Sequence, residues 1–130
     1  MFEATTRNIS VTVEPEYCTE RSAPEDGAYF WLYTITVRNL GTETVQLMTR
    51  HWEITDANGQ TQVVDGRGVV GEQPVLPPDQ AFRYTSGAPL PTPTGFMRGT
   101  YGMAGPDGRG FEVEIPAFSL DSPFAPNTLN

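Results

Sequence analysis

One short glycine-rich segment has the spacing of a known ligand-binding motif. Gly66, Gly68 and Gly71, with Arg67 between the first two, match the pattern G-x-G-x-x-G. In dinucleotide-binding folds such glycines let the backbone approach a pyrophosphate, which binds at the N-terminus of the helix that follows. The motif therefore raises a nucleotide or anion site as a hypothesis.

The residues after the motif do not favour the helix that this chemistry needs. Residues 69–74 include two valines, a glycine and a proline, which cannot sustain three helical turns. A Walker-type phosphate loop needs a lysine, and the chain has none. We therefore expect these glycines to serve backbone geometry, at positive-φ positions or close approaches. The alternative is a small anion or ligand loop made by the backbone N–H groups of Gly66, Gly68 and Gly71 beside Arg67.

Catalytic chemistry has few candidates in this chain. His51 is the only histidine and Cys18 the only cysteine. If Trp52 faces the core, alternation along a strand directs His51 and Glu53 toward solvent. Cys18 lies in a polar stretch with nothing nearby that would activate a thiolate. We expect no catalytic residue, and the sequence predicts a protein that is not an enzyme.

The metal-ligating residues are equally sparse. One histidine and one cysteine cannot complete the usual closed zinc site. Same-face pairs that include acids are ordinary on solvated strand faces, and here they are His51 with Glu53, Glu14 with Glu16, and Glu112 with Glu114. We expect neither a metal site nor a cofactor, although Mg²⁺ or Co²⁺ bound by carboxylates and water is the alternative.

The composition excludes several partner classes. A formal net charge of −8 over 130 residues argues against a broad electrostatic contact with nucleic acid or an anionic membrane. No apolar run reaches the length of a membrane span of about 18 residues, and the first residues lack the pattern of a signal peptide. A single cysteine is typical of a reducing compartment. We expect a cytoplasmic protein without membrane insertion.

The elements that position these residues are strands, because the apolar pattern repeats every two residues. Residues 9–13 alternate, and residues 28–38 do so with Tyr33, Ile35 and Val37 on the core face. Residues 18–27 and 39–42 are predicted as a loop and a turn. Further short strands are expected at residues 62–64, 82–84, 96–103 and 111–115, with a hairpin turn at 58–59.

Two irregularities are predicted along this pattern. Apolar residues occupy odd positions at Val45 and Leu47 but even positions at Trp52 and Ile54, which indicates a β-bulge between them. The prolines at 89, 91 and 93 predict a long extended loop without ladder pairing. The pattern as a whole predicts one all-β domain over residues 1–130, a two-sheet sandwich of about seven or eight antiparallel strands, with a loosely attached tail after about residue 120.

The ordered segments of the chain resemble the ApaG family. The resemblance rests on HWEITD at 51–56, GRGVVGEQP at 66–74, YTSG at 84–87, TPTG at 92–95 and MRGTY at 97–101. It extends from the first strand to about Leu120. It implies an immunoglobulin or fibronectin-type-III-like sandwich in a bacterial cytoplasmic protein. It also implies an association with cobalt resistance and magnesium efflux, and similar domains in eukaryotic proteins have the character of protein-binding modules.

The leading functional hypothesis is a non-enzymatic module that binds another protein. Exposed strand edges and aromatic-rich strands suit such recognition. We expect it at the glycine segment 66–71 and at the proline-rich loop 88–95, because rigid loops of a sandwich commonly carry recognition. The alternative is a small-ligand or ion sensor that binds pyrophosphate, nucleotide or a divalent metal near the glycine segment. The sequence also allows a homo-oligomer through the exposed edge.

Overall fold

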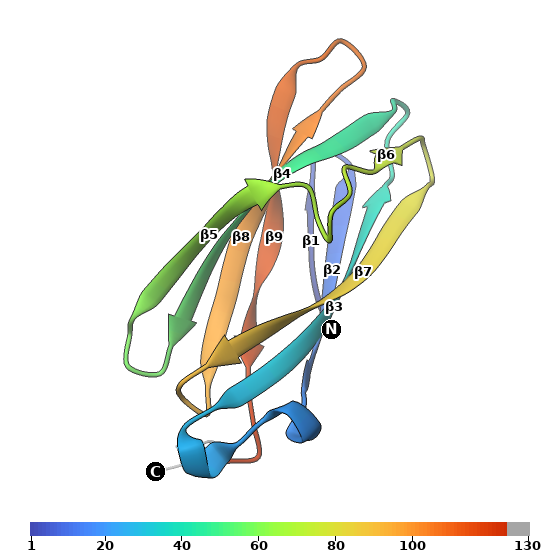
Figure 1. Ribbon diagram of the computed structural model, residues 1–130. Helices are drawn as coiled ribbons and strands as arrows, with labels where there is room; N and C mark the ends of the chain where they lie inside the picture. Colours follow the sequence, from blue (N-terminus) through green and yellow to red (C-terminus); the bar gives the residue numbers. More distant parts are fainter. Residues whose placement is uncertain (125–130) are drawn as a thin grey trace.

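The computed structural model describes residues 1–124, which form two packed antiparallel sheets (Figure 1). The strands of the described residues are β1 (Phe2–Thr6), β2 (Ile9–Tyr17), β3 (Tyr29–Asn39), β4 (Val45–Asp56), β5 (Thr61–Arg67), β6 (Val75–Leu76), β7 (Ala81–Leu90), β8 (Gly95–Ala104) and β9 (Gly110–Leu120). Two short 3₁₀ helices, Thr19–Arg21 and Pro24–Asp26, lie between β2 and β3. No helix among these residues has the length and apolar character needed to span a membrane.

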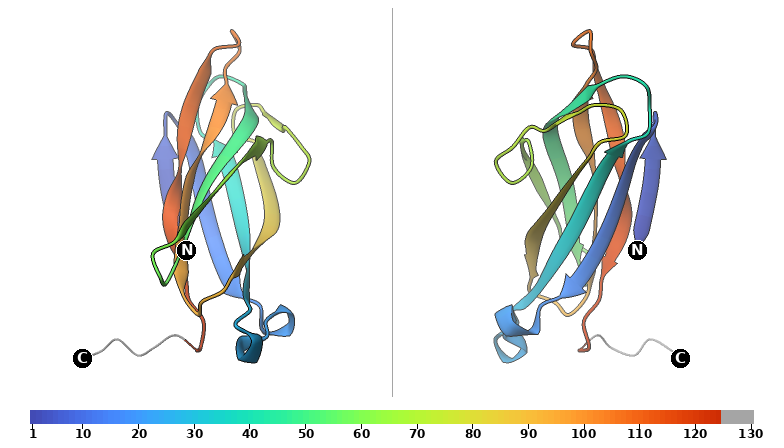
Figure 2. Two further views of the ribbon diagram at one scale, coloured as in Figure 1. Left: turned by 60° about the vertical axis from the view of Figure 1, so that its left-hand side comes forward. Right: turned by 90° about the vertical axis from the view of Figure 1, so that its right-hand side faces the viewer.

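The two sheets face each other as a sandwich (Figure 2). One has the strand order β1-β2-β3-β7 and the other the order β5-β4-β8-β9, with β6 added beside the start of β4. Every strand pair is antiparallel. The predicted fold class, an all-β two-sheet sandwich of the immunoglobulin or fibronectin-type-III kind, is therefore confirmed.

The core lies between the sheets because alternate residues of each strand turn inward. Tyr33, Ile35 and Val37 are buried in β3, as their spacing predicts. At the centre, the rings of Tyr33, Trp52 and Phe118 pack together at centroid distances of 5.5 to 6.0 Å. This aromatic cluster joins the two sheets across the middle of the molecule.

The predicted β-bulge in β4 is present. Leu47 pairs with Met103 and Thr49 pairs with Gly102, so Met48 is an extra residue with no partner in β8. One inserted residue reverses which side chains face inward. Trp52 is consequently buried on the same side of the sheet as Leu47, although their positions differ in parity.

The predicted long loop around the prolines is wrong in part. β7 continues to Leu90, and Pro89 pairs with Phe30 of β3. β7 is an edge strand with β3 as its neighbour in the described sheet. Because a proline lacks only the N–H group, it is tolerated at an edge where that group would point away from the ladder. The unpaired connection is the short one between Leu90 and Gly95.

The last strand is longer than its predicted range of residues 111–115, since β9 extends to Leu120. The register between β8 and β9 shifts between Met97 and Gly99 of β8, so that Pro116 and Ala117 of β9 oppose the single residue Arg98. A bulge of this kind accommodates a proline, because the extra residue makes no ladder hydrogen bond.

The tail that the sequence places after about residue 120 contacts the sandwich as far as it is described. Trp31 Nε1 donates a hydrogen bond to the carbonyl of Asp121 at 2.7 Å. The ring of Phe124 lies 6.3 Å from that of Tyr17. Residues 125–130, the remainder of this tail, lie outside the described residues.

The two long sides of the sandwich differ. On one side β1 reaches β9, where the N–H of Glu114 donates to Thr6 Oγ1 at 3.1 Å and the rings of Phe2 and Phe118 lie 6.1 Å apart. On the other side β5 and β7 are the edge strands of their sheets. They diverge in Figure 1, and no hydrogen bond joins them within residues 1–124. The sandwich is therefore closed on one side and open on the other.

Candidate binding cleft at the open side of the sandwich

The glycine segment forms a tight turn and not the start of a helix. Val69 and Glu72 exchange two backbone hydrogen bonds of 2.8 and 2.9 Å. The two residues between them both have positive φ, 45° at Val70 and 81° at Gly71. Positive φ at both central positions is the geometry of a two-residue hairpin of type I′, which a glycine favours. We call residues 68–73 the glycine hairpin.

Gly66 and Gly68 serve close approaches, as expected from the residues around them. A Cβ atom on Gly68 would lie 2.1 Å from the carbonyl oxygen of Glu72, and its φ is 62°. A Cβ atom on Gly66 would lie 2.7 Å from the guanidinium carbon of Arg50. Gly68 therefore requires glycine, because its neighbour is a backbone atom and its φ is positive, whereas a side chain at position 66 would have to displace the guanidinium of Arg50.

Several backbone donors of the glycine hairpin are already bonded to other parts of the chain. The N–H of Gly68 donates to the carbonyl of Met48, the bulge residue of β4, at 2.8 Å. The N–H groups of Val69 and Glu72 bond to each other's carbonyls. An anion loop at Gly66, Gly68 and Gly71 stays a prediction, and it would have to use the remaining donors.

The arginine at this segment is Arg50 of β4 and not Arg67, the predicted neighbour of the anion loop. Arg67 is exposed. Arg50 Nη1 donates hydrogen bonds to the carbonyls of Arg67 and Gly68, both at 3.0 Å. Arg50 was not predicted from the sequence, although a signal was present: after the parity switch, Arg50 shares the inward face with Trp52 and Ile54.

The open side holds a cleft of about 360 Å³ between the two sheets. Val64 of β5 and the hairpin residues Val69 and Val70 line one wall, while Ala88 and Pro89 of β7 line the other. We call this space the edge cleft. The two regions that the sequence predicts for recognition, the glycine segment and the proline-rich segment, therefore meet at one site.

The inner end of the edge cleft is polar. The side chains there are Tyr33, Arg50, Tyr84 and Ser86. Burial raises the pKa of the Tyr33 phenol, and Ser86 and Arg50 oppose this shift only in part. The Tyr84 hydroxyl is bonded to that of Tyr101, and burial raises the pKa of both. These phenols therefore keep their protons at neutral pH and are hydrogen-bond donors.

Comparison with known proteins places this architecture in a family. Residues 19–105 match the family model described as the ApaG domain. The chain belongs to the ApaG domain family. It is 59% identical over 130 residues to a Protein ApaG of Rhodopseudomonas palustris, covering the whole of both chains. It is 60% identical over 123 residues to that of Rhodospirillum centenum, covering 95% of each.

A solved structure supports both the family and the fold. The crystal structure of a putative ApaA protein from Bordetella pertussis superimposes with a TM-score of 0.88 at 45% identity. The match covers 93% of this chain and 98% of that one. The predicted resemblance to the ApaG family is thus confirmed, and the segments that carried it include those around the edge cleft.

The histidine of this ApaG domain belongs to a chain of ion pairs on the outer face of β4 and β5. His51 Nδ1 lies 2.6 Å from Asp65 Oδ1, and His51 Nε2 lies 3.1 Å from Glu53 Oε2. Arg98 Nη2 in turn donates to Glu53 Oε1 at 3.0 Å. Both ring nitrogens are engaged by carboxylates on opposite sides of the ring, so the two acids do not converge on one metal position. No group of three potential metal ligands occurs within residues 1–124.

This arrangement favours the imidazolium form. Hydrogen bonds to Asp65 and then to Glu53 raise the pKa of His51 above 6.5, and His51 in turn lowers the pKa of Glu53 below 4.5. The contribution of His51 to folding stability is complete below pH 6.5 and is lost as pH rises through its raised pKa. That of Glu53 is complete above pH 4.5 and is lost as pH falls through its lowered pKa.

We expect an NMR titration of the imidazole protons to give His51 a pKa above 6.5. Because the chain has one histidine, its resonances need no assignment. The variant Asp65→Asn should bring the pKa down, since the bond to Asp65 is the largest cause of the shift. Asp107→Asn, which breaks an exposed pair with Arg109, is the control and should leave it unchanged. An unshifted His51 in the wild-type protein contradicts the ion-pair chain.

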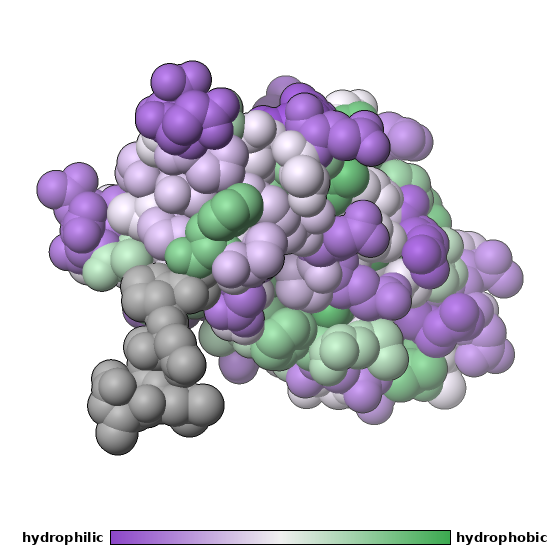
Figure 3. All heavy atoms as spheres, turned by 90° about the horizontal axis from the view of Figure 1, so that it is seen from below, coloured by the Kyte–Doolittle hydropathy of each residue, from purple (hydrophilic) through white to green (hydrophobic). Residues whose placement is uncertain are grey.

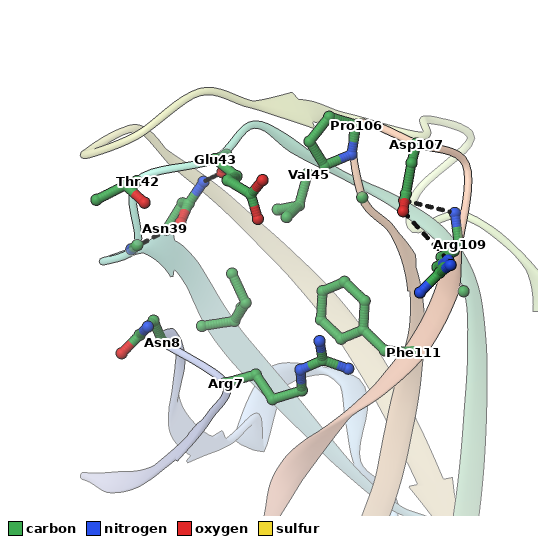
Figure 4. A pocket seen from close by; sticks show the side chains of 14 residues that line it. Arg7, Asn8, Asn39, Thr42, Glu43, Val45, Pro106, Asp107, Arg109 and Phe111 are labelled. Carbon is green, nitrogen blue, oxygen red and sulfur yellow. Dashed lines mark hydrogen bonds and ion pairs between the residues drawn. The ribbon is translucent and has the colours of Figure 1, made fainter.

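A second hollow of about 450 Å³ (Figure 4) lies near the turn between β8 and β9, at the opposite end of the ApaG domain from the 3₁₀ helices (Figure 1). Arg7 stacks on the ring of Phe111 at 4.7 Å, and Arg109 pairs with Asp107 at 3.3 Å. The amide of Asn39 donates to the carbonyl of Glu43, which fixes the loop above it. Its polar groups largely hold its own loops together, so we take the edge cleft as the candidate site.

The other residues considered from sequence lie apart from the cleft. Cys18 precedes the first 3₁₀ helix and is a half-buried free thiol. Arg83 lines a shallow hollow with Glu14 and Glu16 on the outer face of the sheet with the strand order β1-β2-β3-β7. At the end of the molecule near these helices, hydrophobic patches are interrupted by hydrophilic side chains (Figure 3). None of these features joins residues from both sheets as the edge cleft does.

Proposed function

We propose that this protein is a non-enzymatic module of the cytoplasm that binds an extended segment of a partner protein at the edge cleft. The observation that carries the proposal is the open side of the sandwich, where two edge strands flank an apolar cleft. An edge strand offers unpaired N–H and C=O groups to which a partner strand can add. The cleft offers space for alternate side chains of such a strand.

Exposed apolar side chains support this placement. Val63 of β5, Val70 of the glycine hairpin and Val75 of β6 are 55%, 53% and 56% exposed. All three lie along the free edge of one sheet; Val70 lines the edge cleft, whereas Val63 pairs with Glu53 and faces the outer side of the same edge strand. Natural edges are usually protected by charged residues, above all lysine, which this chain lacks. On β5 the charged residues are Asp65 and Arg67, and exposed apolar residues rimmed by polar ones are typical of an interaction surface.

The ion-pair chain supports the absence of catalysis. A histidine that acts as a general base needs a free ring nitrogen directed at its target. His51 instead has both nitrogens bound to carboxylates. The association of the family with cobalt resistance and magnesium efflux fits a module that acts on another protein. We propose that this metal link is indirect.

Site-directed photocrosslinking tests the proposal. A crosslinking amino acid placed at Val63 or at Val70 should capture the same partner in cells, identified by mass spectrometry. The same amino acid at Leu40, which is 52% exposed and lies away from the cleft, is the matched control and should not. The variant Val63→Lys should reduce capture from position 70 at least tenfold. Equal capture from Leu40 would place recognition elsewhere.

A small-ligand sensor is the second candidate function. The volume of the edge cleft, about 360 Å³, lies in the range of small-molecule sites, and Arg50 carries a permanent charge within it. Pyrophosphate, nucleotides, Mg²⁺ and Co²⁺ are the ligands to test by thermal shift. A rise in the melting temperature that Arg50→Gln abolishes favours the sensor. Crosslinking from Val63 without any such rise favours the protein-binding module.

A further inference from the structure

The charge inside the edge cleft has a structural origin in the β4 bulge. Met48 is the inserted residue, and it turns Arg50 from the solvent face to the inner face of the sheet. Arg50 then pairs across the ladder with Gly66 on one side and Tyr101 on the other. It is the one charged side chain among the described residues that line the cleft.

The guanidinium of Arg50 is held in a fixed position. Its Nη1 is bonded to the carbonyls of Arg67 and Gly68, and its plane lies against Gly66, where any Cβ would collide with it. The N–H groups of Nε and Nη2 have no acceptor among residues 1–124. No carboxylate within this range lies close enough to form an ion pair with Arg50. Part of its hydrogen-bonding capacity is therefore free and oriented in advance.

A permanently charged guanidinium beside apolar walls lacks a counter-ion. Arg50 is half-buried, and pairing a guanidinium with a carboxylate gives short, strong hydrogen bonds. The protonated hydroxyls of Tyr33 and Ser86, at the same end of the cleft, are further donors to such a group. The chemistry of this end of the cleft is that of a carboxylate receptor.

The surroundings favour a carboxylate within an otherwise uncharged segment. The protein carries a net charge of −8, which repels a polyacidic ligand. The rest of the cleft is apolar apart from Gln62, with Trp52, Ile54 and Val64 beside Arg50. On a strand added to β5, alternate side chains would face the cleft, one near Gly66 and Arg50 and the next near Val64.

We propose that the edge cleft recognises an extended partner segment in which an aspartate or glutamate, seated on Arg50, lies two residues from an apolar side chain seated beside Trp52 and Val64. This inference rests on the proposed function and adds the chemical class of the partner sequence. The occupant is an internal segment with an acidic side chain, because β5 continues to Arg67, past Gly66, the residue that pairs with Arg50.

A displayed library of random decapeptides, selected against the full-length protein, tests this inference. The enriched peptides should share an acidic residue two positions from an apolar one. For one such peptide, the variant Arg50→Gln should weaken binding at least tenfold. Replacing the acidic residue by its amide should weaken binding to the wild-type protein equally and have no further effect on the variant. A thermal melt of Arg50→Gln shows whether the variant is folded, and Arg83→Gln is the matched control.

The outcomes separate the two proposals. Enriched peptides that Val63→Lys blocks but that carry no acidic residue overturn the role of Arg50 and leave the proposed function standing. A second result would also overturn the proposed acidic side chain. If amidation of the peptide C-terminus abolishes binding while the side-chain amide has no effect, Arg50 binds the terminal carboxylate of a chain. If neither Val63→Lys nor Arg50→Gln affects any selected peptide, both proposals fail.

Discussion

Replacing Gly99 with alanine is expected to lower the free energy of unfolding by about 3 kcal/mol. Gly99 lies in β8 opposite Trp52, directly after the bulge that β9 imposes. A Cβ atom there would lie 2.0 Å from the carbonyl oxygen of His51 and 3.3 Å from the Cα of Trp52. These are backbone atoms of the central strand pair, so the ladder itself must move to admit a methyl group.

Gly110→Ala is the matched control for this substitution. Gly110 begins β9 in the same sheet, and a Cβ atom there would meet its nearest neighbour, the carbonyl of Met103, at an ordinary 3.8 Å. We expect its effect to stay within about 0.5 kcal/mol. Urea unfolding followed by tryptophan fluorescence measures both variants. Equal stability of the two alanine variants would show that the β4–β8 pair is not as close as described.

The second large effect is expected from Phe118→Ala, at about 3–5 kcal/mol. Phe118 is 2% exposed, and its ring packs against those of Tyr33, Trp52 and Phe2. Removing the ring leaves a cavity between the sheets that the strands cannot close without losing their pairing. The loss combines the transfer free energy of the ring with the cost of the cavity.

Phe96→Ala removes the same group from a position that is 44% exposed. We expect Phe96→Ala to lower the free energy of unfolding by about 1 kcal/mol, because folding removes much less of the Phe96 ring from water. Chemical denaturation of both variants at one pH gives the comparison. If Phe96→Ala proved the more destabilising of the two, the centre of the core would not lie at the Tyr33, Trp52 and Phe118 cluster.

Local pattern was sufficient to predict the fold class, although it did not predict the strands β1 and β6. Alternation in residues 9–13 and 28–38 identified the core strands, because a strand buried on one face must repeat its apolar residues every two positions. The change of parity between Leu47 and Trp52 located the β4 bulge, which the register at Met48 confirms. The unhelical residues after Gly68 likewise predicted that this segment would not begin a helix, and it forms a hairpin.

The prolines were less informative about where strands end, because a proline is tolerated wherever no neighbouring strand needs its N–H group. Pro89 lies on an edge strand and Pro116 lies in a bulge, and neither position requires an N–H donor. Sequence alone does not say whether a strand will be an edge or where a register will shift. The predicted ends of β7 and β9 were therefore too early.

The glycine motif and Arg50 show most clearly which features follow from the local sequence and which depend on the packing of the sheets. The residues that follow the motif predict a role in backbone geometry for Gly66, Gly68 and Gly71, since positive φ and close approach are local demands on the chain. What approaches them depends on the packing of a distant strand: the guanidinium of Arg50 lies against Gly66 and binds the carbonyls of Arg67 and Gly68. A cleft between two sheets is made by residues distant along the chain, so its charge and walls become apparent only when the sheets are packed.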